Sequence, residues 1–214
     1  MGRLGTVDVA LPPTDTDTVS WFFRSPLYKH FGLLTEYEGT FTHQGRSVTA
    51  DGLCSFEYGA IPSPYLMRST PLPPAAKAPL DHFVYQIVDL DADTQILLSR
   101  YAIGDRPFMT TAILRTRSGD GTRCRDVDFE MVELRDQSEP TPYGIPMQVP
   151  RRTRFLVKDT RGRPWLDFEG IMDTPFTYGL STGFVTGFAW SAIWRGEEIS
   201  GRRYFEYIDR RSTR

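Results

Sequence analysis

The sequence has 214 residues, of which 40% are hydrophobic, 13% aromatic and 24% charged, a composition typical of a globular protein able to bury a core without disulfides or metals. Its 25 Lys and Arg nearly balance its 27 Asp and Glu, so the formal net charge of -2 gives no long-range attraction to nucleic acid. These values exclude a disordered or fibrous chain and make one domain the default expectation.

The first residues contain no apolar run of the kind that marks a secretory signal. No later stretch reaches the roughly 18 apolar residues of a membrane-spanning helix. We therefore expect a cytoplasmic protein without a membrane span. Cys54 and Cys124 are too few for a disulfide framework or a zinc site, and we expect both to be reduced thiols.

The first predicted element is a short helix in an N-terminal segment over residues 1–31. Asp17 or Thr18 would cap it, and Ser25-Pro26 would end it. Its apolar residues Val19, Trp21, Phe22 and Phe23 need a surface to cover. We expect the segment to plug one end of a barrel or to support its wall.

From residue 32 to the end, runs of β-branched and aromatic residues alternate with short Gly, Pro or Asp clusters such as Gln44-Gly45 and Arg195-Gly196. This rhythm predicts about ten antiparallel strands in which consecutive strands pair. The predicted strands are 33–43, 46–58, 82–90, 94–103, 107–117, 123–135, 147–158, 163–172, 182–195 and 199–210.

Residues 59–80 form a long Pro-rich stretch between two of these runs, which is either a packed lid or a plain connector. An antiparallel sheet of about ten strands accumulates twist and tends to curl or close. We therefore predict an all-β fold over residues 32–214, a single antiparallel up-and-down (lipocalin-like) β-barrel. A barrel of this size has room for one small ligand.

Familiar catalytic motifs are missing: there is no Gly-rich phosphate loop, no HExxH, no GxSxG and no paired CxxC. His30, His43 and His82 are scattered along the chain, so no metal site is expected. We expect no cofactor.

Aromatic residues mark the candidate binding surface. In the run 182–195, alternation puts Phe184, Phe188, Trp190 and Trp194 on one face and small residues on the other. The aromatic face either packs as core or lines a pocket. Interior candidates with a polar tip are Tyr37, Tyr58 and Tyr85, and His82 at the mouth of its strand is a possible acid or base.

In the last predicted strand, alternation places Tyr204 and Glu206 on one face and Phe205, Tyr207 and Asp209 on the other. If Glu206 points inward among aromatic residues, desolvation favours its neutral form and makes it a proton donor. If Glu206 points outward, it is an ordinary solvated charge.

Two segments, Glu36-Tyr37-Glu38-Gly39-Thr40-Phe41 and Gly201-Arg202-Arg203-Tyr204-Phe205-Glu206-Tyr207, resemble a lipocalin-like superfamily of carotenoid hydratases and related natural-product cyclases. Members commonly carry two such barrels, whereas this chain has room for one. The resemblance implies cofactor-free cyclisation, isomerisation or hydration of an apolar polyene, polyketide or terpenoid inside the barrel. It also implies that Tyr204 and Glu206 are catalytic.

Three functions therefore remain open: a cofactor-free enzyme acting on an apolar substrate, a non-catalytic carrier of an apolar small molecule, and a structural or regulatory barrel with a filled core. An inward acid or hydroxyl at the pocket distinguishes the enzyme from the carrier, because a carrier needs only shape and area.

Overall fold

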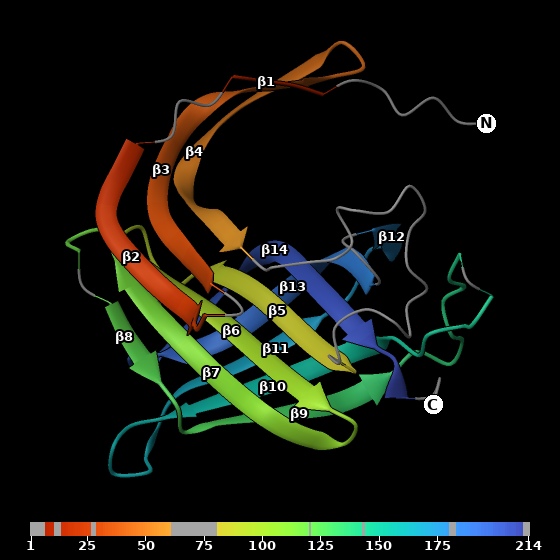
Figure 1. The fold of residues 1–214 in the computed structure, drawn as a ribbon. Coiled ribbons are helices and arrows are strands. Elements are labelled where there is room, and N and C mark those ends of the chain that lie inside the picture. The colour runs from red at the N-terminus through yellow and green to blue at the C-terminus, as the bar shows by residue number, and fades with distance from the viewer. Residues whose placement is uncertain are drawn as a thin grey trace. The chain divides into compact units, whose positions relative to one another are not determined.

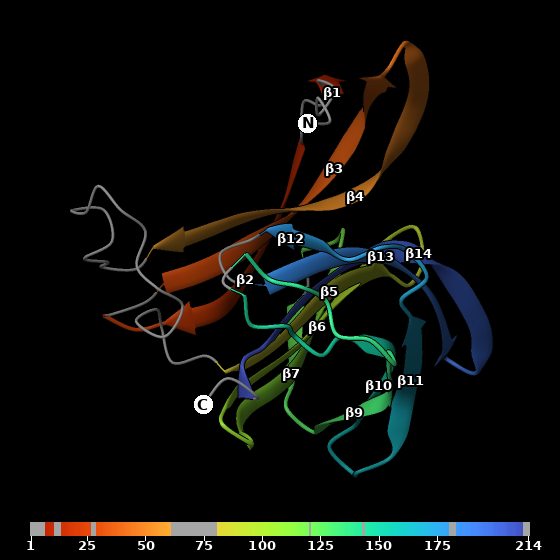
Figure 2. The same ribbon diagram turned by 90° about the vertical axis from the view of Figure 1, so that its right-hand side faces the viewer.

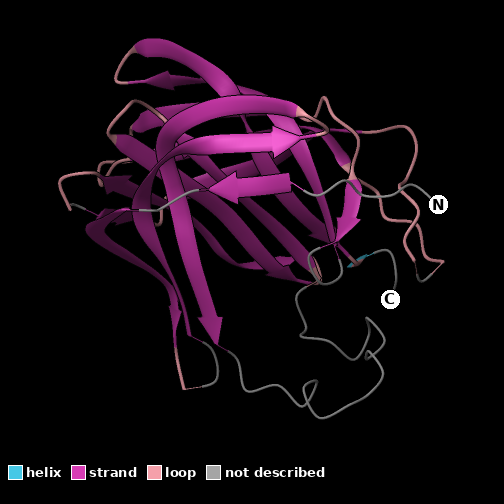
Figure 3. Cartoon of the chain, turned by 90° about the horizontal axis from the view of Figure 1, so that it is seen from above, coloured by secondary structure: helices cyan, strands magenta, loops and turns pink. Residues whose placement is uncertain are grey.

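The computed structural model describes residues 7–10, 14–26, 29–60, 81–119, 121–142, 144–179 and 183–211. Nearly all of this part of the chain is β-strand, as Figure 3 shows, and the strand pairings are antiparallel. The predicted all-β antiparallel fold is confirmed. Among these residues, no helix has the length and hydropathy needed to cross a bilayer. The predicted lid or connector falls largely outside the described residues, which stop at 60 and resume at 81.

Contacts divide the chain into two compact units. The first comprises Met1–Pro64, Asp91–Gln95 and Arg115–Thr122, and the second comprises Tyr65–Leu90, Ile96–Leu114 and Arg123–Arg214. Each unit is described separately.

The first unit contains a four-stranded sheet with the order β1-β3-β2, in which β4 also pairs with β3 (Figure 1). Its strands are β1 (Val7–Ala10), β2 (Thr14–Arg24), β3 (Lys29–His43) and β4 (Arg46–Ala60). The β3–β4 hairpin turns at Gln44 and Gly45, whose φ angles of 51° and 75° match the left-handed backbone of a two-residue hairpin turn.

The helix predicted after Asp17 is wrong, because β2 runs through these residues. Thr14, Thr16, Thr18 and Val19 are β-branched and favour strands, and a helix this short is marginal without tertiary packing. Pairing with β3 satisfies the backbone of β2 instead. Residue 32, the expected start of the barrel, lies inside β3.

The second unit is built on a sheet with the order β8-β7-β6-β5-β14-β13-β11-β10-β9, and β12 pairs with β13. The strands are β5 (His82–Asp89), β6 (Thr94–Ile103), β7 (Arg106–Thr116), β8 (Gly121–Cys124), β9 (Val127–Leu134), β10 (Pro150–Lys158), β11 (Pro164–Ile171), β12 (Thr177–Gly179), β13 (Gly183–Trp194) and β14 (Glu197–Asp209).

The two edges of this sheet are joined by a very short link. β8 ends at Cys124 and β9 begins at Val127, so only Arg125 and Asp126 connect the opposite edges. Because the three Cα–Cα steps from Cys124 to Val127 span at most about 11 Å, the sheet must curl to bring its edges together. Figures 1 and 2 show this strong curvature. At the centre of the sheet, β5 pairs with the last strand, β14.

The core of the second unit lies on one face of the curled sheet. Phe168, Phe188 and Phe205 are completely buried there, and their rings meet edge to face, with 6.1 Å between the centroids of Phe168 and Phe188 and 5.9 Å between those of Phe188 and Phe205. Trp190 stacks on Phe168 at 5.7 Å. This interlocking aromatic packing positions the side chains at the β5–β14 junction.

Candidate active site

The β5–β14 junction carries polar residues on its core face. The register pairs His82 with Asp209, Val84 with Tyr207 and Gln86 with Phe205. Directly opposed residues of an antiparallel pair project to the same face. Because Val84, Phe205 and Tyr207 belong to the core, His82, Asp209 and Gln86 project to that face as well.

His82 is buried and held in one tautomer. Its side chain is 1% exposed, and Arg100 Nη1 donates a hydrogen bond to its Nδ1 at 2.8 Å. An arginine has only donors, so Nδ1 is the acceptor and the ring proton of the neutral imidazole lies on Nε2. Burial and the positive charges of Arg100 and Arg211 lower the pKa of His82 to about 3. The imidazole is therefore neutral near pH 7.

Tyr207 and Asp209 form a second part of the site. Tyr207 is completely buried, and its Oη donates to Asp209 Oδ2 at 3.2 Å. Burial and the charge of Asp209 raise the pKa of the Tyr207 phenol well above its usual range. Burial alone would raise the pKa of Asp209, but hydrogen bonds from Arg211, including Nη2 to Oδ2 at 2.6 Å, hold that pKa below its usual range.

These residues lie together in an aromatic setting. The rings of His82 and Tyr207 meet edge to face at 5.6 Å, and Phe129 lies against His82 at 6.1 Å. Arg100 also lies over the Phe129 ring, 5.5 Å from its centroid. The result is a neutral imidazole, a neutral phenol and an ionised carboxylate packed together, with the Asp209 side chain 13% exposed. Such a combination can donate and accept protons.

Other buried polar atoms face the same interior. Gln86 Nε2 and Oε1, Thr153 Oγ1 and Trp190 Nε1 have no hydrogen-bond partner within the described part of the chain. Buried polar groups are ordinarily hydrogen-bonded, so these atoms are available to an ordered water or to a polar group of a ligand.

The structure brings only one of the predicted site residues, His82, into this cluster. The predicted binding residues Phe184, Phe188, Trp190 and Trp194 pack in the core, between 0% and 7% exposed. In the first unit, Tyr37 is half-buried and Tyr58 is 51% exposed. The role of these residues in binding a substrate stays a prediction.

Glu206 and Tyr204 occupy the opposite face of the β5–β14 pair. Tyr204 is 43% exposed, and its Oη donates to Glu206 Oε1 at 2.5 Å. Glu206 is directly opposite Tyr85, which is buried and stacks on Phe83. Alternation separates them from His82 and Tyr207, so the catalytic role predicted for them stays an untested alternative to a site on the core face.

The sequence reasoning missed Tyr207, Asp209, Arg100 and Arg211. One signal was present: alternation along the last strand already placed Asp209 on the same face as Phe205 and Tyr207. An acid aligned with two aromatic core residues is a sign of a buried carboxylate. The position of Arg100 depends on strand pairing and carried no such signal, whereas Arg211 reaches Asp209 from two residues further along the chain.

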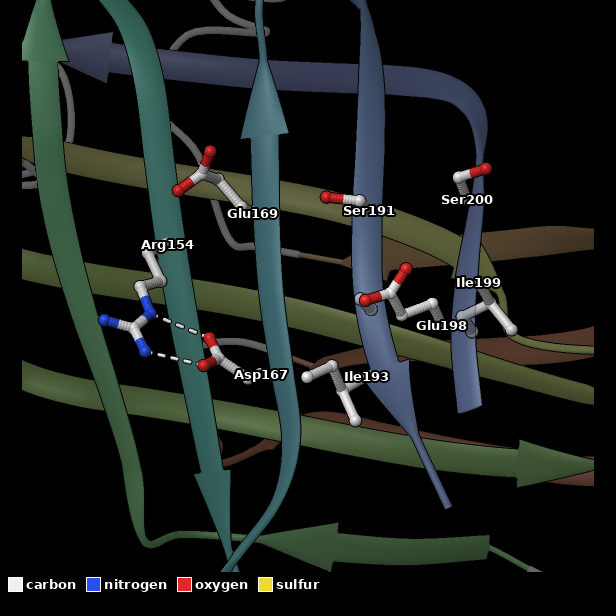
Figure 4. Close-up of a pocket in the computed structure, with 9 residues that line it drawn as sticks. Arg154, Asp167, Glu169, Ser191, Ile193, Glu198, Ile199 and Ser200 are labelled. Atoms are coloured by element: carbon white, nitrogen blue, oxygen red, sulfur yellow. Dashed lines mark hydrogen bonds and ion pairs between the residues drawn. The ribbon is translucent and has the colours of Figure 1, made fainter. Parts of the chain in front are cut away.

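A groove of about 560 Å³ lies elsewhere on the second unit, on the outer side of β10, β11, β13 and β14 (Figure 4). Arg154 Nε and Nη2 there donate to the two carboxylate oxygens of Asp167 at 2.7 and 2.6 Å. The floor includes Ser191 and Ser200, and Ile193 is 50% exposed. Of the charged side chains in this groove, Arg154 and Asp167 pair with each other and Glu169 pairs with Arg152. No group of three or more metal-ligating side chains occurs among the described residues.

A search of curated proteins found no match. Among solved structures, the chain is similar to kievitone hydratase from Nectria haematococca, with a TM-score of 0.59 and 11% sequence identity, over 98% of this chain and 69% of that one. At this identity the likeness shows the fold alone, which agrees with the antiparallel β fold expected from the sequence. Residues 2–214 match the Family of unknown function (DUF6670), and the chain therefore belongs to that family.

Proposed function

We propose that this protein is a cofactor-free enzyme that adds water to, or removes water from, an apolar substrate in which a carbon–carbon double bond is conjugated to a carbonyl. The observation that carries the proposal is the buried contact of His82 with Tyr207, whose phenol is bonded to the ionised Asp209. The hydratase fold of the structural neighbour agrees with this chemistry.

The groups have complementary roles in such a reaction. Tyr207 Oη takes a proton from water as its own proton moves to Asp209 Oδ2, and the water oxygen bonds to the β-carbon. The π electrons move to the carbonyl oxygen, where the Nε2–H of neutral His82 stabilises the enolate. Tyr207 then returns the proton to the α-carbon and recovers its own from Asp209. One water has been added, and dehydration is the reverse.

Arg100 and Arg211 serve as positioning residues in this scheme. Arg100 fixes the His82 tautomer, and Arg211 keeps Asp209 ionised. The aromatic surroundings exclude water and match an apolar substrate, so little more than shape and two polar contacts is required.

The test is incubation of the purified protein with chalcone-type enones in isotopically labelled water, followed by mass spectrometry. We expect a product heavier by one labelled water, or lighter by one water for a hydrated starting compound. The His82→Asn variant should reduce turnover by at least about a hundredfold, the usual cost of removing one hydrogen-bond donor to a developing oxyanion.

Glu206→Gln, on the other face of the same strands, is the matched control and should retain turnover. Loss of activity in Glu206→Gln with full activity in His82→Asn would move the site to the opposite face. Saturable binding of these compounds without any change in their mass would show that the protein is a carrier and not an enzyme.

A further inference from the structure

Arg115, near the end of β7, belongs to the first unit and is completely buried. Its guanidinium lies over Gly32 of β3: a Cβ atom added at Gly32 would be 3.0 Å from Arg115 Nη1. Gly32 thus leaves the space that the guanidinium occupies. A larger residue at this position would displace a buried positive charge.

The partners of this charge are neutral. Nη1 donates to Ser55 Oγ at 3.2 Å, Nη2 donates to Gln95 Oε1, and Nε has no partner within the described residues. None of the ion pairs formed among the described residues includes Arg115. Glu57 is linked to it through Ser55, whose hydroxyl donates to Glu57 Oε1 at 3.3 Å.

Other arginines of the chain use the same edge of the guanidinium for carboxylates. Arg154 donates from Nε and Nη2 to Asp167, at 2.7 and 2.6 Å. Arg211 donates from Nε and Nη2 to Asp209, at 2.9 and 2.6 Å. On this edge of Arg115, Nη2 donates to the neutral amide oxygen of Gln95, and the Nε–H has no hydrogen-bond partner within the described residues. A planar oxyanion fits the edge that is left incomplete.

A second unbonded polar group lies on the same face of the first unit's sheet. Ser20 is directly opposite Gly32 in the β2–β3 register, so both project to the face that Arg115 covers. Ser20 is 5% exposed, and its Oγ has no hydrogen-bond partner within the described residues. A buried guanidinium N–H and a buried hydroxyl, neither with a partner among the described residues, are costly unless a ligand completes their hydrogen bonds.

We infer that Arg115, with Ser20 and Ser55, forms a binding site in the first unit for the carboxylate of a small organic acid. The carboxylate takes the Nε edge of Arg115 and accepts a further hydrogen bond from Ser20. This site is independent of the proposed hydration chemistry. Glu57, which bonds His30 at 3.3 Å and is linked to Arg115 through Ser55, is the competing carboxylate of the chain itself.

The test is nitrogen–proton NMR of the arginine Nε–H groups in the full chain, titrated with benzoate and, as an uncharged analogue, benzamide. The Arg115 signal is assigned from its loss in Arg115→Lys. We expect a saturable shift of this signal with benzoate and none with benzamide. The Nε–H signals of Arg154 and Arg211 should stay in place because their carboxylates already occupy them.

Two variants sharpen the result without removing Arg115. Glu57→Gln should tighten benzoate binding by roughly two- to fivefold, the size of one surface charge contribution. Ser20→Ala should weaken it. An Arg115 signal that does not move with benzoate, moves equally with benzamide, or moves together with those of Arg154 and Arg211 would overturn the inference.

Discussion

The neutral state of His82 makes stability depend on pH in a defined window. Its pKa is about 3 in the folded protein, against 6.5 for an ordinary histidine, because burial and Arg100 oppose the charged ring. A lowered pKa means that the unfolded chain binds a proton that the folded chain does not. The contribution is therefore fully present above pH 6.5 and is lost as the pH falls toward 3.

The magnitude follows from these two values. Between pH 7 and pH 5 the wild type should lose about 2 kcal/mol of unfolding free energy through His82, rising to about 4 kcal/mol near pH 3. For a chain of this length, 2 kcal/mol corresponds to a fall in Tm of about 4–8 °C. The lowered pKa of the Asp209 carboxyl acts in a more acidic window, so the interval from pH 5 to 7 isolates His82.

Urea unfolding of the wild type and of His82→Asn at pH 7, 6 and 5 measures the contribution of His82 to the unfolding free energy. The difference in unfolding free energy between the two proteins should shrink by about 2 kcal/mol from pH 7 to 5, because the variant has no imidazole at this position. His30 and His43 are present in both proteins, so their contributions cancel in the difference between the two unfolding free energies. A difference that stays constant over this interval would refute the buried neutral histidine.

Three further predictions concern packing and charge. Gly201→Ala would place a Cβ 2.9 Å from the Trp190 ring, and we expect this overpacking to cost about 1–3 kcal/mol in urea unfolding. Phe188→Ala removes a completely buried ring from the aromatic core and should cost about 3–5 kcal/mol; a much smaller loss would mean that the core is loosely packed. Asp167→Asn breaks a solvent-accessible pair with Arg154 and should leave the unfolding midpoint nearly unchanged, which makes it the surface control.

Local pattern was enough to predict most of the strands after residue 32 and the alternation of side chains along them. The runs expected at 182–195 and 199–210 correspond to β13 (Gly183–Trp194) and β14 (Glu197–Asp209). Alternation correctly separated Tyr204 and Glu206 from Phe205 and Tyr207, because the side-chain period of a strand is fixed at two. The pattern alone could not say which of the two faces meets the core.

The strand at Thr14–Arg24 and the cluster around His82 depended on contacts between residues far apart in the sequence. The apolar run around Trp21 and Phe22 suits a helix or a strand, and its pairing with β3 decides the outcome. His82 meets Asp209 only because β5 pairs with the last strand. The same pairing brings Tyr207 beside His82, and strand order then adds Arg100. No local spacing encodes this meeting, so the cluster could not be read from motifs.

The central claim is that proton transfer occurs on the core face of the β5–β14 pair. The most direct test is a comparison of turnover in Tyr207→Phe and Tyr204→Phe, two substitutions that remove the same hydroxyl from opposite faces of β14. Circular dichroism confirms that both variants are folded. We predict that Tyr207→Phe loses at least about a hundredfold in kcat while Tyr204→Phe remains within about twofold of the wild type. Full turnover in folded Tyr207→Phe would contradict the account.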